Sequence, residues 1–349
     1  PNMPETIIAM LATASIGAIW SSSSPDFGIK GVLDRFTQIE PKVLFAANGY
    51  YYNGKKFDSL EKLSSILDQL PSVNHVVVTP YTDSNHDISS VKNGILWDNF
   101  IDSNPSPLKF EQLPFQHPLY IMYSSGTTGL PKSIVHGAGG TLIQHLKELR
   151  LHGNIYPEDT IFYFTTCGWM MWNWLVSNLA IGAAIVLYDG SPLQPNSNAM
   201  WDMVDELGIT HFGTSAKYID ACRQEGLSPI KTHSLESMRT IFSTGSPLVE
   251  ESFDYVYNQI KKEIQLASIS GGTDIISCFA GGNPTLPVYR GELQSITLGM
   301  DVAAYNPEGN PIQNEKGELV CRKAFPSMPI HFWNDPNGEK YHQAYFNVL

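Results

Sequence analysis

The segment from Tyr123 to Ser133 concentrates the residue types that bind phosphate groups. It contains several small hydroxyl side chains, two glycines and one lysine, and it has no acidic side chain. Glycines leave backbone N–H groups open to a ligand, hydroxyl groups donate hydrogen bonds, and the Lys132 ammonium group attracts an anion. This combination suits a polyphosphate. The candidate phosphate-binding residues are Ser124, Ser125, Gly126, Thr127, Thr128, Gly129 and Lys132.

The spacing of this segment differs from that of the ordinary P-loop. Walker A sequences read G-x-x-x-x-G-K followed by Ser or Thr, whereas Pro131 stands here in place of the second glycine. Strand-like runs at 118–125 and 133–137 flank the segment, so we expect a loop between two strands. For such a Gly/Ser/Thr run taken by itself, a solvent-exposed hairpin is the alternative interpretation.

The order of the residues resembles the phosphate-loop signature of the adenylate-forming (ANL) superfamily. Residues 123–132 match that signature at every position. The superfamily contains acyl-CoA synthetases, the adenylation domains of peptide synthetases and luciferases. The resemblance implies an enzyme that uses ATP to activate a carboxylic acid, with Lys132 and Thr273 as the catalytic residues.

Two later segments follow in the order that the resemblance implies. The segment STGSPL at 243–248 resembles the one that lies against adenine. In SGGTD at 270–274, the resemblance places Thr273 toward the α-phosphate and Asp274 where a glutamate usually binds Mg²⁺, so the carboxylate is kept on a shorter side chain. Each segment alone could be a turn or the end of a strand. The implied ATP/AMP contacts are Gly245, Ser246, Pro247, Ser270, Gly272 and Thr273.

The acyl side of the implied site departs from the acetyl- and propionyl-CoA synthetases. Those enzymes generally carry Trp-Trp-Gln where this chain has Ser-Gly-Gly at 270–272, which implies that Gly271 leaves room for a longer acid. The runs TTCGWMMWNW at 165–174 and FGTSAKY at 212–218 resemble the branch that converts acetoacetate to acetoacetyl-CoA. Ordinary core packing is the alternative for a Trp/Met run. The implied acyl pocket comprises Trp169, Met170, Met171, Thr244 and Gly271.

Two residues of the run at 212–218 are further candidates. Ser215 is a possible contact for CoA. Lys217 follows a strand-like run and could meet a substrate oxygen or a phosphate, or could equally be an exposed lysine at the start of a helix.

Alternating helix-like and strand-like patterns predict an α/β fold. Apolar runs at 42–47, 75–79, 209–214, 239–245 and 264–272 read as strands, with helical stripes between them. One such stripe, formed by Leu142, Ile143, Leu146 and Leu149, predicts the buried face of a helix that begins near Thr141 and ends near Gly153. The economical architecture is a mostly parallel sheet with helices on its faces, in which ligands bind beyond the carboxyl ends of the strands.

The rhythm changes near residue 292 to short alternating runs separated by turns, which predict part of a small antiparallel β-barrel. We therefore expect three parts, at about 1–115, about 116–290 and about 291–349, within one AMP-binding N-terminal domain. The superfamily continues with a ribose-binding aspartate and a C-terminal domain that bears a catalytic lysine. Neither motif occurs here, so we expect this chain to be an incomplete N-terminal domain and inactive by itself.

Composition restricts the function further. Of 349 residues, 42% are hydrophobic and 16% charged, as in a folded enzyme, and the net charge of −12 argues against a nucleic-acid surface. The uncharged run at 161–188 is long enough to span a membrane, but its polar residues favour a buried strand, loop, helix and second strand. Four isolated cysteines and no secretory signal predict the cytoplasm.

The sequence thus predicts an acetoacetate–CoA ligase with ATP, acetoacetate and CoA as substrates, Mg²⁺ as the required ion and no prosthetic group. A synthetase for another short or medium acid is one alternative, and a non-catalytic nucleotide-binding module is another. The oligomeric state stays open.

Overall fold

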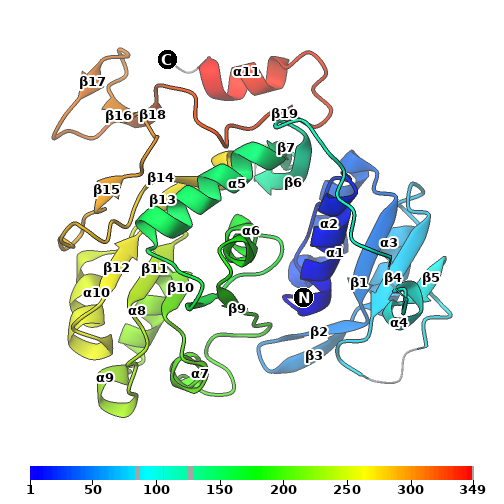
Figure 1. Cartoon of the computed structure of the whole chain (residues 1–349), viewed down its shortest axis with the longest axis horizontal. Coiled ribbons are helices and arrows are strands. Elements are labelled where there is room, and N and C mark those ends of the chain that lie inside the picture. Colours follow the sequence, from blue (N-terminus) through cyan, green and yellow to red (C-terminus); the bar gives the residue numbers. More distant parts are fainter. Residues whose placement is uncertain (84–86, 105, 125–128, 348–349) are drawn as a thin grey trace.

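Two parallel sheets with helices packed on them are the main parts of the fold; in Figure 1 the larger lies at the left and the smaller at the right. The computed structural model describes residues 1–83, 87–104, 106–124 and 129–347. The larger sheet has the order β12-β11-β10-β8-β9, and all of its strands are parallel. Its strands are β8 (Thr160–Tyr163), β9 (Ala184–Val186), β10 (His211–Ser215), β11 (Thr240–Thr244) and β12 (Gln265–Ser268).

Helices cover the larger sheet, and the hydrophobic core lies between these helices and the strands. Trp201 and Phe212 stack with ring centroids 5.1 Å apart, and both side chains are fully buried. The uncharged run at 161–188 forms strand, helix and strand as predicted, and among the described residues no helix is both long and apolar enough to cross a bilayer. The helices are α6 (Met170–Val176), η3 (Ser177–Ala180), α7 (Ala199–Leu207), α8 (Ala216–Gln224), α9 (Pro229–Thr232), α10 (Glu250–Tyr255) and η4 (Val256–Ile260).

The smaller parallel sheet is built from the first hundred residues and has the order β1-β4-β5. Its central strand is buried on both faces, with Val76, Val77 and Val78 fully inaccessible, as a continuous apolar run predicts. Strands β1 (Val43–Ala47), β4 (His75–Thr79) and β5 (Gly94–Leu96) make the sheet, and β2 (Gly49–Tyr52) and β3 (Lys55–Asp58) form a separate hairpin. The helices here are α1 (Pro4–Ser15), η1 (Pro25–Phe27), α2 (Gly28–Ile39), α3 (Leu60–Leu67) and α4 (Trp97–Phe100).

A third sheet holds the glycine-rich segment. Strands β6 (Pro118–Ser124) and β7 (Lys132–Gly137) pair antiparallel, so the segment joins two strands as predicted, and β19 (His331–Phe332) adds to the other edge of β7. The following helix α5 (Ala138–Lys147) begins before Thr141, which is buried inside it, and continues as one π-helical turn, η2 (Glu148–His152). Figure 1 shows α5 crossing the centre of the molecule.

Short antiparallel strands follow β12, and they begin at Ser270, before the predicted change near residue 292. The run at 264–272, predicted as one strand, is divided between β12 and the first of these strands. They form two small three-stranded sheets, and the described residues contain no closed barrel. The first sheet comprises β13 (Ser270–Gly272), β14 (Ser277–Gly281) and β15 (Ser295–Ile296), with the turn η5 (Thr273–Ile275) between β13 and β14. The second comprises β16 (Val302–Tyr305), β17 (Pro311–Ile312) and β18 (Glu318–Cys321), and helix α11 (Glu339–Phe346) follows.

Candidate active site

A cavity of about 580 Å³ lies beyond the carboxyl ends of β11 and β12. Its size is typical of sites for small molecules and cofactors. In the larger sheet Ser243 lies opposite Ser268 in register, so these two strands end at the same level and their following loops meet. Eleven predicted site residues line this one cavity: Trp169, Met170, Met171, Thr244, Gly245, Ser246, Pro247, Ser270, Gly271, Gly272 and Thr273.

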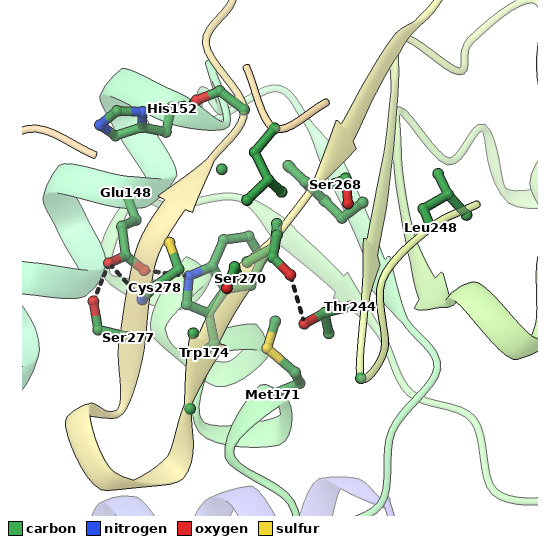
Figure 2. Close-up of a pocket in the computed structure, with 18 of the residues that line it drawn as sticks. Glu148, His152, Met171, Trp174, Thr244, Leu248, Ser268, Ser270, Ser277 and Cys278 are labelled. Atoms are coloured by element: carbon green, nitrogen blue, oxygen red, sulfur yellow. Dashed lines mark hydrogen bonds between the residues drawn. The ribbon is translucent and has the colours of Figure 1, made fainter. Parts of the chain in front are cut away.

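The turn after β11 presents the predicted adenine segment. The Thr244 hydroxyl donates a hydrogen bond to the Ile269 carbonyl oxygen at 3.3 Å and so ties this turn to the end of β12 (Figure 2). Gly245 has φ of +89°, a conformation that favours glycine, and it redirects the chain into Ser246 and Pro247. The turn therefore has one defined conformation at the wall of the cavity.

Gly271 lines the cavity, but the space of its missing side chain is occupied. A Cβ atom at this position would lie 2.2 Å from the Ser277 carbonyl oxygen and 2.5 Å from the Cys278 Cα, both in β14. The register of β13 and β14 shifts at Ser270 and Gly271, which brings the two backbones together. Glycine at position 271 thus allows the backbones of β13 and β14 to lie close together.

The described members of the predicted phosphate-binding set, Ser124, Gly129 and Lys132, lie at the ends of strands β6 and β7 and in the loop between them. Ser124 and Lys132 pair across β6 and β7 at the two ends of the loop, and Gly129 has φ of +111°. The Lys132 Nζ lies 3.9 Å from the Asp274 Oδ1, and the two side chains are 39% and 34% exposed. Ser125, Gly126, Thr127 and Thr128 lie outside the described residues.

The donor set near Asp274 fits Mg²⁺ that arrives on ATP. Among the described residues no group of three or more His, Cys, Asp or Glu side chains could hold a metal ion. Mg²⁺ in nucleotide sites is commonly held by one or two carboxylates together with substrate phosphates. One carboxylate beside a lysine matches that arrangement, and a metal cage made by protein alone does not occur in this part of the chain.

Ser215 and Lys217 lie apart from the cavity wall. The Ser215 hydroxyl accepts a hydrogen bond from the Tyr218 N–H at 3.2 Å and caps α8, which is an ordinary structural role. A Cβ atom added at Gly245 would lie 4.0 Å from the Ser215 Cβ, so Ser215 is a neighbour of the adenine segment. Lys217 is exposed at the start of α8. This matches the alternative of an exposed lysine at a helix start, and not that of a lysine that meets a substrate oxygen or a phosphate.

Sequence reasoning missed the buried carboxylate of Glu148, which closes one end of the cavity (Figure 2). Its side chain is in contact with donors from three elements and is 3% exposed. Nothing in the pattern around 148 marked it, since a glutamate in a helical segment usually faces water. The donors are Trp174 Nε1 at 3.1 Å, Gln144 Nε2 at 3.3 Å, Cys278 N at 3.4 Å, Lys147 Nζ at 3.5 Å and the Ser277 hydroxyl.

This carboxylate positions two parts of the cavity wall. Trp174 donates its N–H to Glu148, and its ring meets Phe242 edge-on at 5.4 Å between centroids. The Cys278 thiol lines the same wall, and burial, followed by the charge of Glu148, raises its pKa well above the usual value. Cys278 is therefore a neutral thiol in a largely apolar wall.

Comparisons with known proteins agree with this geometry. The chain is 58% identical to an acetoacetyl-CoA synthetase of Gallus gallus and 57% identical to an acetoacetyl-coenzyme A synthetase of Rhizobium meliloti (strain 1021); each match covers 99% of this chain and 53% of the relative. The solved acetoacetyl-CoA synthetase from Streptomyces lividans superposes with a TM-score of 0.94 at 45% identity over all of this chain and 54% of that one.

The chain therefore spans about half the length of the curated relatives it matches. The model of a family described as AMP-binding enzyme matches residues 1–328, most of the chain. These matches confirm the resemblance inferred from the motifs, and the chain belongs to the AMP-binding enzyme family.

Proposed function

We propose that this chain forms the acid- and nucleotide-binding part of an acetoacetate–CoA ligase. The observation that carries the proposal is the single cavity in which the segments at 169–171, 244–247 and 270–273 meet. Relatives 55–58% identical over nearly the whole chain, which bear the name acetoacetyl-CoA synthetase, support the choice of acid.

The proposed reaction has two steps. A carboxylate oxygen of acetoacetate attacks the α-phosphorus of ATP, the bond to the β-phosphate oxygen breaks, and pyrophosphate leaves. The CoA sulfur then attacks the acyl carbon, its proton passes to solvent, and AMP leaves with the electron pair of the broken C–O bond. Both steps require mainly that reactants are positioned and that negative charge is stabilised.

Each group of residues has a proposed role in that positioning. Gly245, Ser246 and Pro247 lie against adenine, and Thr273 contacts the α-phosphate. The Lys132 ammonium group, with the hydroxyl and backbone N–H groups of 124–129, holds the β- and γ-phosphates. Asp274 holds Mg²⁺, which neutralises phosphate charge when it is bound. Ser270 and Gly272 border the nucleotide, and Ser215 remains a proposed CoA contact.

We propose that the acyl pocket is formed by Trp169, Met170, Met171, Thr244 and Gly271. The space behind Gly271 is occupied by β14. We therefore propose that the buried wall formed by Trp174 and Glu148 limits the length of the acid that fits the pocket. The cytoplasm is the proposed location, because all four cysteines are unpaired.

The test is the formation of AMP and pyrophosphate by the purified protein that contains this chain. We expect AMP release that depends on ATP, acetoacetate and CoA together, with acetoacetate preferred to acetate and butyrate. If the protein prefers another acid, the proposed substrate is wrong, but the proposed acid–CoA ligase reaction still holds. ATP binding without AMP release under all acids would identify a nucleotide-binding module instead.

A further inference from the structure

Helix α11 brings a phenol group to the phosphate end of the candidate site. The Tyr345 hydroxyl donates a hydrogen bond to the Asp274 Oδ1 at 2.6 Å, across 71 positions of sequence. Figure 1 shows α11 lying over the edge of the molecule formed by β7 and β19.

The position of Tyr345 is set by contacts other than this bond. The Asp335 carboxylate accepts hydrogen bonds from the N–H groups of Lys340 and Tyr341 at 3.2 and 2.9 Å, at the start of α11. The Tyr341 hydroxyl donates to the Pro329 carbonyl oxygen at 2.9 Å. Phe332 of β19 meets the Tyr345 ring edge-on at 5.5 Å. The helix therefore presents the phenol from a fixed place.

Lys132 forms an ion pair with the same carboxylate oxygen. Its Nζ lies 3.9 Å from the Asp274 Oδ1 and stands over the rings of Tyr345 and Phe332, at 5.7 and 5.8 Å from their centroids. Ammonium groups at such distances are attracted by the negative faces of aromatic rings. Tyr345 thus contacts both charged groups of this end of the site, with its hydroxyl and with its ring.

This arrangement leaves the second oxygen of Asp274 available. Within the ranges 1–83, 87–104, 106–124 and 129–347, no group donates a hydrogen bond to the Asp274 Oδ2. A carboxylate with one oxygen fixed can offer the other as a metal ligand in one orientation. Groups that orient a ligand in this way commonly affect metal affinity by roughly 10- to 100-fold.

We propose that Tyr345 is a positioning residue that fixes the Asp274 carboxylate so that its free oxygen meets the Mg²⁺ carried by ATP. The inference rests on the proposed function, since it takes Asp274 as the metal ligand. It also explains how aspartate serves at a position where the shorter side chain reaches less far: the phenol removes the rotational freedom of that side chain.

The test measures metal binding directly, with Mn²⁺ as the spectroscopic probe. The change in the electron paramagnetic resonance spectrum of Mn²⁺·ATP on titration with the protein gives the affinity for Mn²⁺·ATP, and calorimetry with a chelator gives the affinity for metal-free ATP. We expect Tyr345→Phe to weaken Mn²⁺·ATP binding roughly tenfold and to leave metal-free ATP binding unchanged. Gln343→Ala changes an exposed side chain of the same helix and should change neither affinity.

Three outcomes separate the possibilities. If Tyr345→Phe lowers the melting temperature but keeps the wild-type Mn²⁺·ATP affinity, the phenol only fastens α11 and the inference is wrong. If Asp274→Asn loses metal-dependent binding and Tyr345→Phe has no further effect in that background, the coupling supports the inference. A wild-type protein without any metal-dependent ATP binding would overturn the proposed function and this inference together.

Discussion

At the scale of single residues, Lys132 has surroundings that suit a phosphate clamp. Its ammonium group has one carboxylate nearby, at 3.9 Å, and two aromatic rings beneath it. It keeps about two fifths of its side chain exposed, so it can turn toward an incoming anion. A lysine tied into a fully buried ion pair would lack that freedom.

We predict that Lys132→Ala reduces adenylation by roughly tenfold to a thousandfold, because a charge-assisted contact to the transferring phosphates is lost. Exchange of labelled pyrophosphate into ATP in the presence of acetoacetate measures this step. Lys316→Ala, at an exposed position, is the control and should keep wild-type exchange. Unchanged exchange in Lys132→Ala would remove this lysine from the mechanism.

A second residue-scale prediction concerns Gly271. Any side chain there meets the backbone of β14 at 2.2 Å, so Gly271→Ala must separate two strands, and we expect a loss of about 1–3 kcal/mol in the free energy of unfolding. Gly272→Ala is the matched control, because the nearest atom to its Cβ would be 4.0 Å away. Urea denaturation measures both. Equal stability of the two variants would show that β14 yields easily and that a larger side chain at 271 can test the acyl pocket.

At the scale of elements, α5 and η2 bury a polar face. Gln144, His145 and Glu148 are almost inaccessible, whereas Leu142 and Ile143 of the predicted apolar stripe are 45% and 51% exposed. His145 lies between the Ser177 hydroxyl at 2.8 Å and the Ile276 carbonyl oxygen at 2.7 Å. Partners from η3 and from the residue that follows η5 therefore compensate for the burial of His145.

We predict that Glu148→Gln costs about 1–3 kcal/mol in the free energy of unfolding, because the amide NH₂ group turns a donor toward Trp174 or Ser277, which are donors themselves. Glu158→Gln, on the exposed stretch before β8, should change stability little. Urea denaturation followed by circular dichroism compares them. If both variants match the wild type, the network around Glu148 contributes no net stability.

The sequence predicted the elements with strong local signals. The apolar runs of β1, β4 and β11 and the loop between β6 and β7 lie where their patterns placed them. The buried face of α5 could not be predicted, because its partners Ser277 and Ile276 lie about 130 residues further along the chain. The contact of Tyr345 with Asp274 could not be predicted for the same reason, because the two residues lie 71 positions apart and no local pattern indicates the contact. The roles assigned to the site residues remain predictions.

At the scale of the whole molecule, the fold buries neutral histidines in several layers. His136 in β7, His145 in α5 and His211 in β10 are at most 1% exposed. Burial lowers the pKa of His136 to about 3 and that of His211 to about 4, and burial also lowers the pKa of His145. In the unfolded chain all three would titrate near the ordinary value of about 6.5.

These histidines make the stability of the chain sensitive to mild acid. Between about pH 6.5 and the lowered values, the unfolded state binds protons that the folded state excludes, so the free energy of unfolding falls as the pH falls. The contribution is fully present above about pH 6.5 and amounts to up to roughly 1.4 kcal/mol per pH unit for each group. For His136 and His211 together, we predict a loss of roughly 2 to 3 kcal/mol per pH unit near pH 5.

Urea denaturation at about pH 7, 6 and 5 measures this slope. In His136→Gln the slope should decrease by the equivalent of one proton, roughly 1.4 kcal/mol per pH unit, whatever the variant does to stability at about pH 7. His75→Gln is the control, because that side chain lies in solvent at the start of β4, and it should keep the wild-type slope. A His136→Gln variant with the wild-type slope would mean that His136 takes up a proton without unfolding.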